Sequence, residues 1–363
     1  MPLKVKAEAL KDFCARVFEA LGVWPEDAAI TADVLVAADL RGIDSHGVAR
    51  LHRYVNGLRQ GIMLARPEIK TLHETTTTAL IDGGAGLGHP IGVKAMKLAI
   101  GKAKEMGAGF VAVRNSNHYG IAGYYAMMAL PHEFIGISMT NSELLVVPTF
   151  GRDAMLGTNP IAVAIPAGKE RPFVLDMATS VVPRGKLEVY ERLEKPLPLG
   201  WATDEYGLGT TDASRVLKNI INRGGGGILP LGGEGELFGG HKGYGLALLV
   251  DILSGVLSGA GYANTVYPKD ESGRPLPSNV GHFFGALRID AFRPLEEFKA
   301  TMDDIIRRLK NSAKAEGQKR IYIHGEKEFE MEEKRRLEGI PLHPKVAESL
   351  RQIGEEVGVK YSL

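Results

Sequence analysis

Residues 109–130 read GFVAVRNSNHYGIAGYYAMMAL, and this stretch indicates the class of fold. An apolar run typical of a buried strand ends in the polar loop NSNHYG, and a helical pattern follows. Such a strand, loop and helix unit is typical of α/β proteins, in which ligands bind beyond the carboxyl ends of strands. His118 lies in this loop, so we expect it beside a ligand. A loop histidine with only local hydrogen bonds is the alternative.

The same element types alternate along the rest of the chain. The apolar spacing predicts two helices within residues 4–40 and another over 90–106. Strands are predicted in TTTTALIDGG, FIGISMTNS, AMLGTNPIAVAIP and FVLDMAT. We therefore expect an α/β protein of two or three structural units.

Three segments of the second half differ from this pattern. Residues 185–240 are rich in Gly and Pro and are predicted to be mostly loop, with RGGGG (223–227) as the most mobile point. YGLALLVDILSGVLSGA (244–260) is apolar on nearly every face, which predicts a buried helix. From Arg293 onward the pattern is charged amphipathic helix, interrupted by the strand-like RIYIHGE (320–326).

The overall composition favours small-molecule chemistry. The 363 residues include 44 basic and 43 acidic side chains, so no basic surplus exists for nucleic acid or an anionic membrane. No apolar run reaches the ~18 residues that span a bilayer, and the N-terminus lacks a signal-peptide core. We therefore expect a cytoplasmic protein without a membrane partner. Cys14 is the only cysteine, which excludes disulfide scaffolds and thiolate metal sites.

The segment GIDSHGVAR (42–50) brings an acid/base group and an anion-binding group together. His46 and Arg50 are spaced i and i+4, so on a helix capped by Asp44 or Ser45 they share one face, and Arg53 falls there too. Apolar residues on the opposite side are expected in the core. They are Val48, Leu51, Val55 and Leu58. One interpretation is a site where Arg50 grips a carboxylate while His46 moves a proton. The other is an amphipathic helix with a wetted polar face.

Seven segments, in order, resemble the malate/L-lactate dehydrogenase family. They are RGIDSHGVARLHRY, NSNHYGIAGYYA, GTNPIAVAIP, DMATSVVPRGK, PLGWATDEYGLGTTD, LPLGG and GHKGYGLALLVDILSGVLSGA. That family is separate from the Rossmann-fold lactate and malate dehydrogenases and is similar to ureidoglycolate, sulfolactate and diketogulonate oxidoreductases. The resemblance covers about residues 5–345 and implies NAD- or NADP-dependent interconversion of a 2-hydroxy acid and a 2-oxo acid, in a homodimer. The chain itself lacks the G-x-G-x-x-G fingerprint, because GAGLG (84–88) is followed by His89 where a glycine is required.

The resemblance and the element pattern together predict the architecture. A helical N-terminal part (1–75) carries the SHG motif, and an α/β cofactor-binding domain (76–290) contains a non-Rossmann mixed sheet. A mainly helical C-terminal part (291–363) is expected to pack with the N-terminal part, so that both chain ends build one helical domain.

Further substrate-site candidates follow from the resemblance and from position. The resemblance implies that Thr158 helps Arg50 to hold the substrate carboxylate, and that His118 contacts the cofactor or transfers a proton, in competition with His46. Asp176 follows an apolar strand and is expected to orient His46, or else is an ordinary strand-end residue. A carboxylate beside that imidazole would raise its pKa above the ordinary value of about 6.5. A hydrolase triad of Ser45, His46 and Asp176 is a further alternative. Adjacent residues of a helix project about 100° apart, so His46 is poorly placed to activate the hydroxyl of Ser45.

The glycine-rich GHKGYG carries the clearest phosphate-binding signal. Its glycines allow close backbone approach, Lys242 supplies charge, and a helix N-terminus follows. A glycine-rich helix start with a solvated lysine is the alternative. The cofactor candidates, most of them implied by the resemblance, are His118, Gly120, Asn141, Met177, Ala178, Thr179, Lys242, Gly243, Gly325 and Glu326. Relatives carry a proline at the position of His324, which weakens the inference for Gly325 and Glu326.

The sequence thus predicts a hydride-transfer enzyme in which His46 moves the hydroxyl proton. We expect malate and oxaloacetate as its substrate pair, because Arg53 or another basic group can meet a second carboxylate. Lactate, sulfolactate and ureidoglycolate are the alternatives within the family, and a non-catalytic carboxylate-binding protein is the alternative from another class. We expect no metal. The chain lacks the acidic residue that binds the cofactor ribose in Rossmann domains, so the sequence does not distinguish NAD from NADP.

Overall fold

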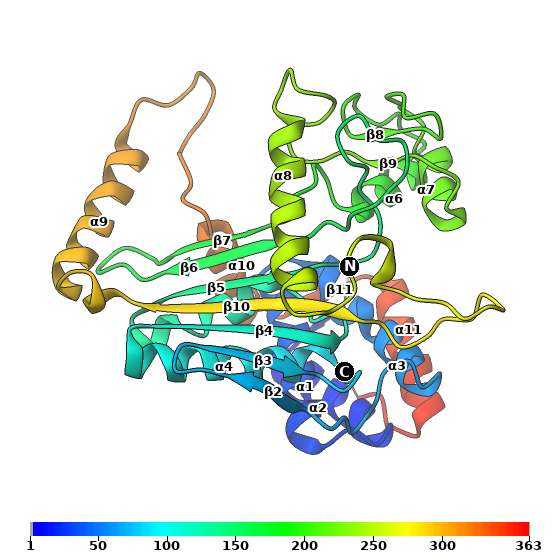
Figure 1. Cartoon of the computed structure of the whole chain (residues 1–363), viewed down its shortest axis with the longest axis horizontal. Helices are drawn as coiled ribbons and strands as arrows, with labels where there is room; N and C mark the ends of the chain where they lie inside the picture. Colours follow the sequence, from blue (N-terminus) through cyan, green and yellow to red (C-terminus); the bar gives the residue numbers. More distant parts are fainter. Residues whose placement is uncertain (1–2, 363) are drawn as a thin grey trace.

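A seven-stranded mixed sheet runs through the centre of the computed structural model, which describes residues 3–362 (Figure 1). The strands, in spatial order, are β2 (Lys70–Glu74), β3 (Thr78–Asp82), β4 (Ala108–Ser116), β10 (Val280–Arg288), β5 (Phe134–Thr140), β6 (Ile161–Ile165) and β7 (Phe173–Met177). Only β3 and β4 are parallel, and every other pair is antiparallel. The prediction of a mixed, non-Rossmann sheet is therefore confirmed.

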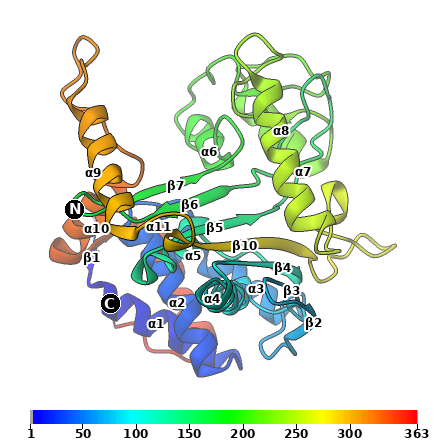
Figure 2. The same ribbon diagram turned by 60° about the vertical axis from the view of Figure 1, so that its left-hand side comes forward.

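Two helices cover one face of this sheet. They are α4 (Gly88–Met106) and α5 (Ala122–Met127), which is followed by the 3₁₀ turn η3 (Leu130–His132). Their small and branched side chains form a core with β4 and β10, and Figure 2 shows α4 end-on beneath these strands. Each helix follows a strand as the sequence predicted, and the loop that contains His118 joins β4 to α5.

Both ends of the chain build one helical unit. The N-terminal part contributes β1 (Leu3–Val5), α1 (Ala7–Ala20), α2 (Pro25–Leu40) and α3 (Leu51–Arg59). The C-terminal part contributes α10 (Glu326–Glu338), β11 (Ile340–Leu342) and α11 (Pro344–Val357). β1 pairs with β11, and buried residues such as Phe13 and Ile353 share one apolar cluster, which confirms the predicted helical unit. The residue limits of the domains stay a prediction.

The prediction that residues 185–240 are mostly loop is confirmed, since helices and strands take up only 23 of these 56 residues. This region contains α6 (Arg184–Arg192), β8 (Ala202–Thr203), α7 (Ala213–Asn222) and β9 (Gly227–Ile228), and these elements have an apolar core of their own. α7 begins where the Asp212 side chain accepts a hydrogen bond from the amide of Arg215 at 2.9 Å, a standard N-cap. The glycines after α7 serve a tight turn, since a Cβ at Gly226 would lie 2.5 Å from the carbonyl oxygen of Thr203.

Two predictions for the second half are wrong. α8 (Gly240–Asp251) and its π-helical continuation (Ile252–Val256) stand above the sheet in Figure 1, and their apolar face is exposed. RIYIHGE forms no strand; a single hydrogen bond, from the amide of Val174 to the carbonyl of His324, joins it to β7. The remaining elements are α9 (Leu295–Asn311) and the 3₁₀ turns η1 (Asp44–His46), η2 (Val48–Arg50), η5 (Ala263–Thr265) and η6 (Ile289–Ala291). No helix within residues 3–362 is long and apolar enough to cross a membrane.

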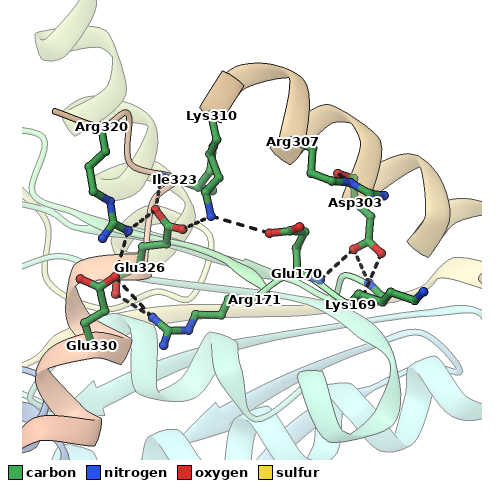
Figure 3. Close-up of polar contacts among 11 residues, drawn as sticks. Lys169, Glu170, Arg171, Asp303, Arg307, Lys310, Arg320, Ile323, Glu326 and Glu330 are labelled. Carbon is green, nitrogen blue, oxygen red and sulfur yellow. Dashed lines mark hydrogen bonds and ion pairs between the residues drawn. The ribbon is translucent and has the colours of Figure 1, made fainter. Parts of the chain in front are cut away.

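A network of polar contacts secures the outer edge of the sheet beside β7 (Figure 3). Asp303 of α9 accepts hydrogen bonds from three successive amides of the β6–β7 turn, residues 168–170, at 2.8–3.1 Å. Glu326, only 6% exposed, pairs with Lys310 and Arg320 and accepts from the amide of Ile323. Burial alone would raise the pKa of Glu326, but these partners hold it below its usual value. The network thereby ties α9 and residues 320–326 to the sheet.

We predict that Glu326→Gln lowers the free energy of unfolding by about 2–4 kcal/mol, because it leaves two cations without their buried partner. Glu330→Gln is the matched control: Glu330 also pairs with Arg320, but its side chain is 42% exposed. This control substitution should lower the free energy of unfolding by less than about 1 kcal/mol. Thermal and urea unfolding of both variants measures the difference, and equal losses would contradict the prediction.

Candidate active site

A cavity of about 350 Å³ brings together most of the predicted substrate-site residues. Its lining includes Ser45, His46, Arg50, Arg53, His118, Thr158, Arg184, Glu188 and Tyr267. These residues come from the SHG turn, the start of α3, the loop after β4, the β5–β6 connection, α6 and the loop before β10. Five separate parts of the chain in addition to the SHG turn therefore meet here.

The predicted helix at the SHG motif does not form. Residues 44–50 make two 3₁₀ turns, and α3 begins only at Leu51, so His46 and Arg50 do not share a helical face. Gly47 between the turns is extended, at φ −85° and ψ −153°. The predicted core positions Val48, Leu51 and Val55 are nevertheless buried.

The buried carboxylate of Asp39 causes this break. It accepts a hydrogen bond from the amide of Val48 at 2.8 Å, and a Cβ at Gly47 would lie 1.9 Å from its Oδ1 atom. Only glycine therefore fits at position 47. Arg335 of α10 donates to the carbonyl of Asp39 and pairs with Asp44, so the C-terminal helices also hold this turn. Burial raises the pKa of Asp39 to about 7.

His46 is a neutral imidazole at pH 7. Burial, together with the nearby charges of Arg50 and Arg53, lowers its pKa to about 4. Its Nδ1 atom lies 2.9 Å from the hydroxyl of Ser45, and its ring stacks against that of His118 with centroids 5.7 Å apart. The other ring nitrogen, Nε2, makes no hydrogen bond within the described chain.

The predicted contact between Asp176 and His46 is wrong. Asp176 accepts a hydrogen bond from the amide of Gly123 at 2.8 Å and lines a different cavity. The pKa of His46 accordingly moves down and not up. The carboxyl group is open to solvent through its cavity, yet the protein atoms around it raise the pKa of Asp176 to about 6. A Ser45, His46 and Asp176 triad is likewise not assembled.

His118 is held from its Nδ1 side. The Tyr54 hydroxyl lies 2.7 Å from Nδ1, and the amide of Gly120 donates to the same nitrogen at 3.3 Å. Because an amide can only donate, Nδ1 is an acceptor, and the neutral ring carries its proton on Nε2. Burial keeps the pKa of His118 well below its ordinary value, with Arg53 as the next cause. His118 is thus a neutral donor in the wall of the cavity.

Three arginines line the cavity, together with the carboxylates of Glu143 and Glu188. The Nε of Arg50 donates to the carbonyl of Ser45 at 2.8 Å, which leaves its two terminal nitrogens for a ligand. Arg53 donates to the Tyr267 hydroxyl at 3.3 Å, and Arg184 pairs with Glu188 at 3.0 Å. Thr158 adds a neutral hydroxyl. Planar guanidinium groups beside a hydroxyl are suited to binding carboxylates.

A second cavity, of about 260 Å³, lies where β7 meets residues 322–328. Asp176, Gly123, His324 and Gly325 line it, and Arg184, eight residues after Asp176, lines the first cavity. The backbone approaches closely here: Gly325 has φ +93°, and a Cβ on it would lie 2.9 Å from Cβ of Val174. Such glycines allow a ligand to approach the backbone closely at this cavity. Met177 and Ala178, at the end of β7, are half-buried.

The side chains of three predicted cofactor residues make hydrogen bonds within the protein. The side chain of Asn141 binds Asp251, the carbonyl of Gly261 and the amide of Gly281, while the Thr179 hydroxyl donates to backbone carbonyls of residues 158 and 159. Glu326 points into the network of Figure 3. These three side chains therefore position backbone near the cavities.

The glycines of GHKGYG have a packing role in this structure. A Cβ at Gly243 would lie 2.1 Å from the carbonyl oxygen of Leu231, and one at Gly240 would lie 2.1 Å from that of Gly233. The glycines therefore admit the loop of residues 231–235 against α8. Lys242 is exposed at the start of α8 and lines neither of the two cavities. Among residues 3–362, no cluster of three His, Cys, Asp or Glu side chains is placed to hold a metal ion.

The family model described as malate/L-lactate dehydrogenase matches residues 5–351. The chain belongs to the malate/L-lactate dehydrogenase family. It is 53% identical over 358 residues to a malate dehydrogenase of Pyrococcus abyssi, covering 99% of this chain and 96% of that protein. It is 41% identical to an L-sulfolactate dehydrogenase of Methanocaldococcus jannaschii, covering 98% and 97%. The solved malate dehydrogenase of Pyrococcus horikoshii superposes with a TM-score of 0.89 at 50% identity, covering 99% of this chain and 97% of that one.

This membership makes the chain a dehydrogenase that acts on the CH–OH group of a 2-hydroxy acid. Sequence reasoning missed four groups of the dehydrogenase site: Asp39, Tyr54, Arg184 and Tyr267. Asp39 and Tyr54 sit at apolar helical positions and read as core residues, while Tyr267 lies in a loop without a motif. Arg184 stands within the quoted DMATSVVPRGK, so its place in a family motif was the one available signal.

We predict that Asp39→Asn removes a pH dependence from the stability of the dehydrogenase. The folded pKa of about 7 lies above the unfolded value of 3.8, so stability from this group is greatest at low pH and is lost as the pH rises toward 7. The melting temperature of the wild type should therefore fall by a few degrees more than that of the variant between pH 5 and pH 8. Parallel melting curves across this range would contradict the assignment.

Proposed function

We propose that this dehydrogenase interconverts malate and oxaloacetate with NAD or NADP. The observation that carries the proposal is the presence of Arg50, Arg53 and Arg184 around His46 in one cavity. A monocarboxylate needs one such cation, whereas a four-carbon dicarboxylate needs two. The 53% identity to a protein named malate dehydrogenase supports the same substrate.

Arg50 and Thr158 are proposed to hold the carboxylate next to the reacting carbon. Arg50 is already oriented by the carbonyl of Ser45, so less side-chain entropy is lost on binding. Arg53 is proposed to bind the second carboxylate, because the Tyr267 hydroxyl supports it from the cavity wall. A substrate held at both ends presents its 2-hydroxyl group toward the two histidines.

His46 is proposed as the acid/base. It is neutral before substrate arrives, and its Nε2 has no internal partner, so it can accept the hydroxyl proton of malate. The two carboxylates of malate offset the arginine charges, which raises the pKa of His46 toward neutrality. His118, with its proton on Nε2, donates a hydrogen bond to the same oxygen. His118 is unsuited to be the base because its Nδ1 already accepts two hydrogen bonds.

The nicotinamide cofactor, when bound, accepts the hydride from the substrate carbon. His324 and the backbone of Gly325, which line the second cavity, are proposed to hold it together with the backbone of Met177 and Ala178 at the end of β7. The backbone at Gly120, whose amide donates to Nδ1 of His118, is proposed to contact the cofactor as well. Gly243 has the packing role described above, and the phosphate contact of the exposed Lys242 stays a prediction.

Steady-state reduction of 2-oxo acids, followed by absorbance at 340 nm with NADH and with NADPH, tests the substrate. We predict that kcat/KM for oxaloacetate exceeds that for pyruvate by about 10–100-fold, the value of one charge-assisted contact. Arg53→Gln should remove most of this preference while kcat/KM for pyruvate changes little. Sulfopyruvate belongs in the panel because it is also a dianion. Pyruvate as the better substrate would overturn the proposal, and binding of oxaloacetate without turnover would indicate a binding protein.

We predict that His46→Ala lowers kcat for malate oxidation at least ~10²-fold and removes the acid limb of the kcat/KM profile, with cofactor affinity unchanged. His118→Ala is the matched comparison, since its ring lines the same cavity. That variant should lose rate but keep the acid limb. If the limb disappears in His118→Ala and persists in His46→Ala, the roles of the two histidines are exchanged.

We further propose that the dehydrogenase is a homodimer in which a second copy covers the exposed face of α8 and its continuation. Leu248, Leu249, Ile252 and Val256 are 38–56% exposed along that face, and exposed apolar stripes of this kind mark interfaces. The family resemblance implies the same assembly.

Light scattering coupled to gel filtration measures the assembly directly. We predict a dimer for the wild type and a monomer for Leu249→Glu, because a buried unpaired carboxylate opposes association. Leu337→Glu is the control: Leu337 is 89% exposed on α10, away from α8, and its replacement should leave the mass unchanged. A monomeric wild type would overturn this proposal.

A further inference from the structure

His89 is a buried histidine that the mechanism does not use, and it has no hydrogen-bond partner within the described chain. It lies in the first turn of α4 and is 0% exposed. Neither Nδ1 nor Nε2 has a partner. A buried polar group without a partner destabilises a fold, and an aliphatic side chain of similar size would avoid that cost. The position therefore calls for an explanation other than packing alone.

The surroundings of His89 supply that explanation. Its ring packs edge-to-face against the ring of Tyr54, with centroids 4.7 Å apart and an interplanar angle of 72°. On another side it meets Gly120, where a Cβ would lie 3.4 Å from Cδ2 and 3.5 Å from Nε2 of His89. Tyr54 and Gly120 are the two groups that hold Nδ1 of His118.

We propose that His89 is a positioning residue for His118. Its flat ring supports Tyr54 and the backbone at Gly120 together, and this keeps the Tyr54 hydroxyl on Nδ1 of His118. The proton of His118 is thereby kept on Nε2, in the wall of the substrate cavity. The inference rests on the proposed role of His118 as a donor to the substrate oxygen.

The charges nearby require His89 to be neutral. Arg50 and Arg53 lie on the side of the SHG turn and α3, His46 and His118 line the cavity, and His282 lies in β10. Burial is the main cause that lowers the pKa of His89 to about 3, and His282 and Arg53 contribute less. His89 therefore adds a rigid ring without adding a further positive charge to the site.

His89→Leu separates a positioning role from a structural one. We expect its melting temperature to rise by a few degrees, because two unsatisfied nitrogens are removed, while kcat falls roughly 10–100-fold as His118 is misplaced. The ¹⁵N imidazole shifts of His118, recorded without substrate, should change from one Nε2–H tautomer to a mixture. In the Tyr54→Phe background the same replacement should change kcat less than twofold, because the hydroxyl it acts through is absent.

His89→Gln and Met96→Leu complete the experiment. Gln keeps a polar side chain of similar length without the ring, so the His89→Gln variant should have a lower kcat and no higher melting temperature. This variant also tests the inference if His89→Leu does not fold. Met96 is a buried residue of the same helix, and its replacement should leave both kcat and the His118 shifts unchanged.

Unchanged His118 shifts in both His89 variants would overturn the inference. So would a loss of kcat that persists in full in the Tyr54→Phe background. Because the shifts need no substrate, a failure of the positioning role is distinguishable from a failure of the proposed malate activity.

Discussion

The hydrogen bond from the amide of Val48 to the buried carboxylate of Asp39 is the constraint on which the candidate active site depends. It stops the chain from entering a helix at residue 44 and leaves room only for glycine at position 47. The two short turns that result aim His46 and Arg50 into one cavity although they do not share a helical face. α3 then starts at Leu51 and delivers Tyr54 to Nδ1 of His118, so both histidines are placed from the same turn.

The central sheet supports the other side of the site in a comparable way. His282 of β10 bonds the hydroxyl of Ser116 at the end of β4 and that of Thr140 at the end of β5. The loops that follow these two strands carry His118 and Asn141. Burial lowers the pKa of His282 to about 3, so this bridge is neutral and adds no charge near the arginines. Fully bonded, rigid groups behind a site hold its reacting groups in place better than flexible ones.

Elements with local signals were predictable from the sequence, and elements shaped by distant partners were not. The apolar periodicity of residues 90–106 predicted α4, and the apolar run before His118 predicted β4. The family motifs predicted four site residues that share one cavity: His46, Arg50, His118 and Thr158. The break at Gly47 was unpredictable because its cause, Asp39, sits in an apolar stretch of α2. The Gly- and Pro-rich flanks concealed α7, and α8 was misassigned because its apolar face has no partner within one chain. Asp176 was assigned to the correct strand, but its carboxyl group accepts a hydrogen bond from the amide of Gly123 and makes none with His46.

The order of strands in the sheet has a consequence for how the chain acquires its structure. β10, contributed by residues 280–288, lies between β4 and β5, and β1 at residues 3–5 pairs with β11 at residues 340–342. During synthesis the inner edges of β4 and β5 stay unpaired until more than three quarters of the polypeptide has emerged. Contacts this distant in sequence slow folding, and open strand edges invite aggregation. Nascent chains of this topology therefore depend on protection of those edges, whether by chaperones or by fast release from the ribosome.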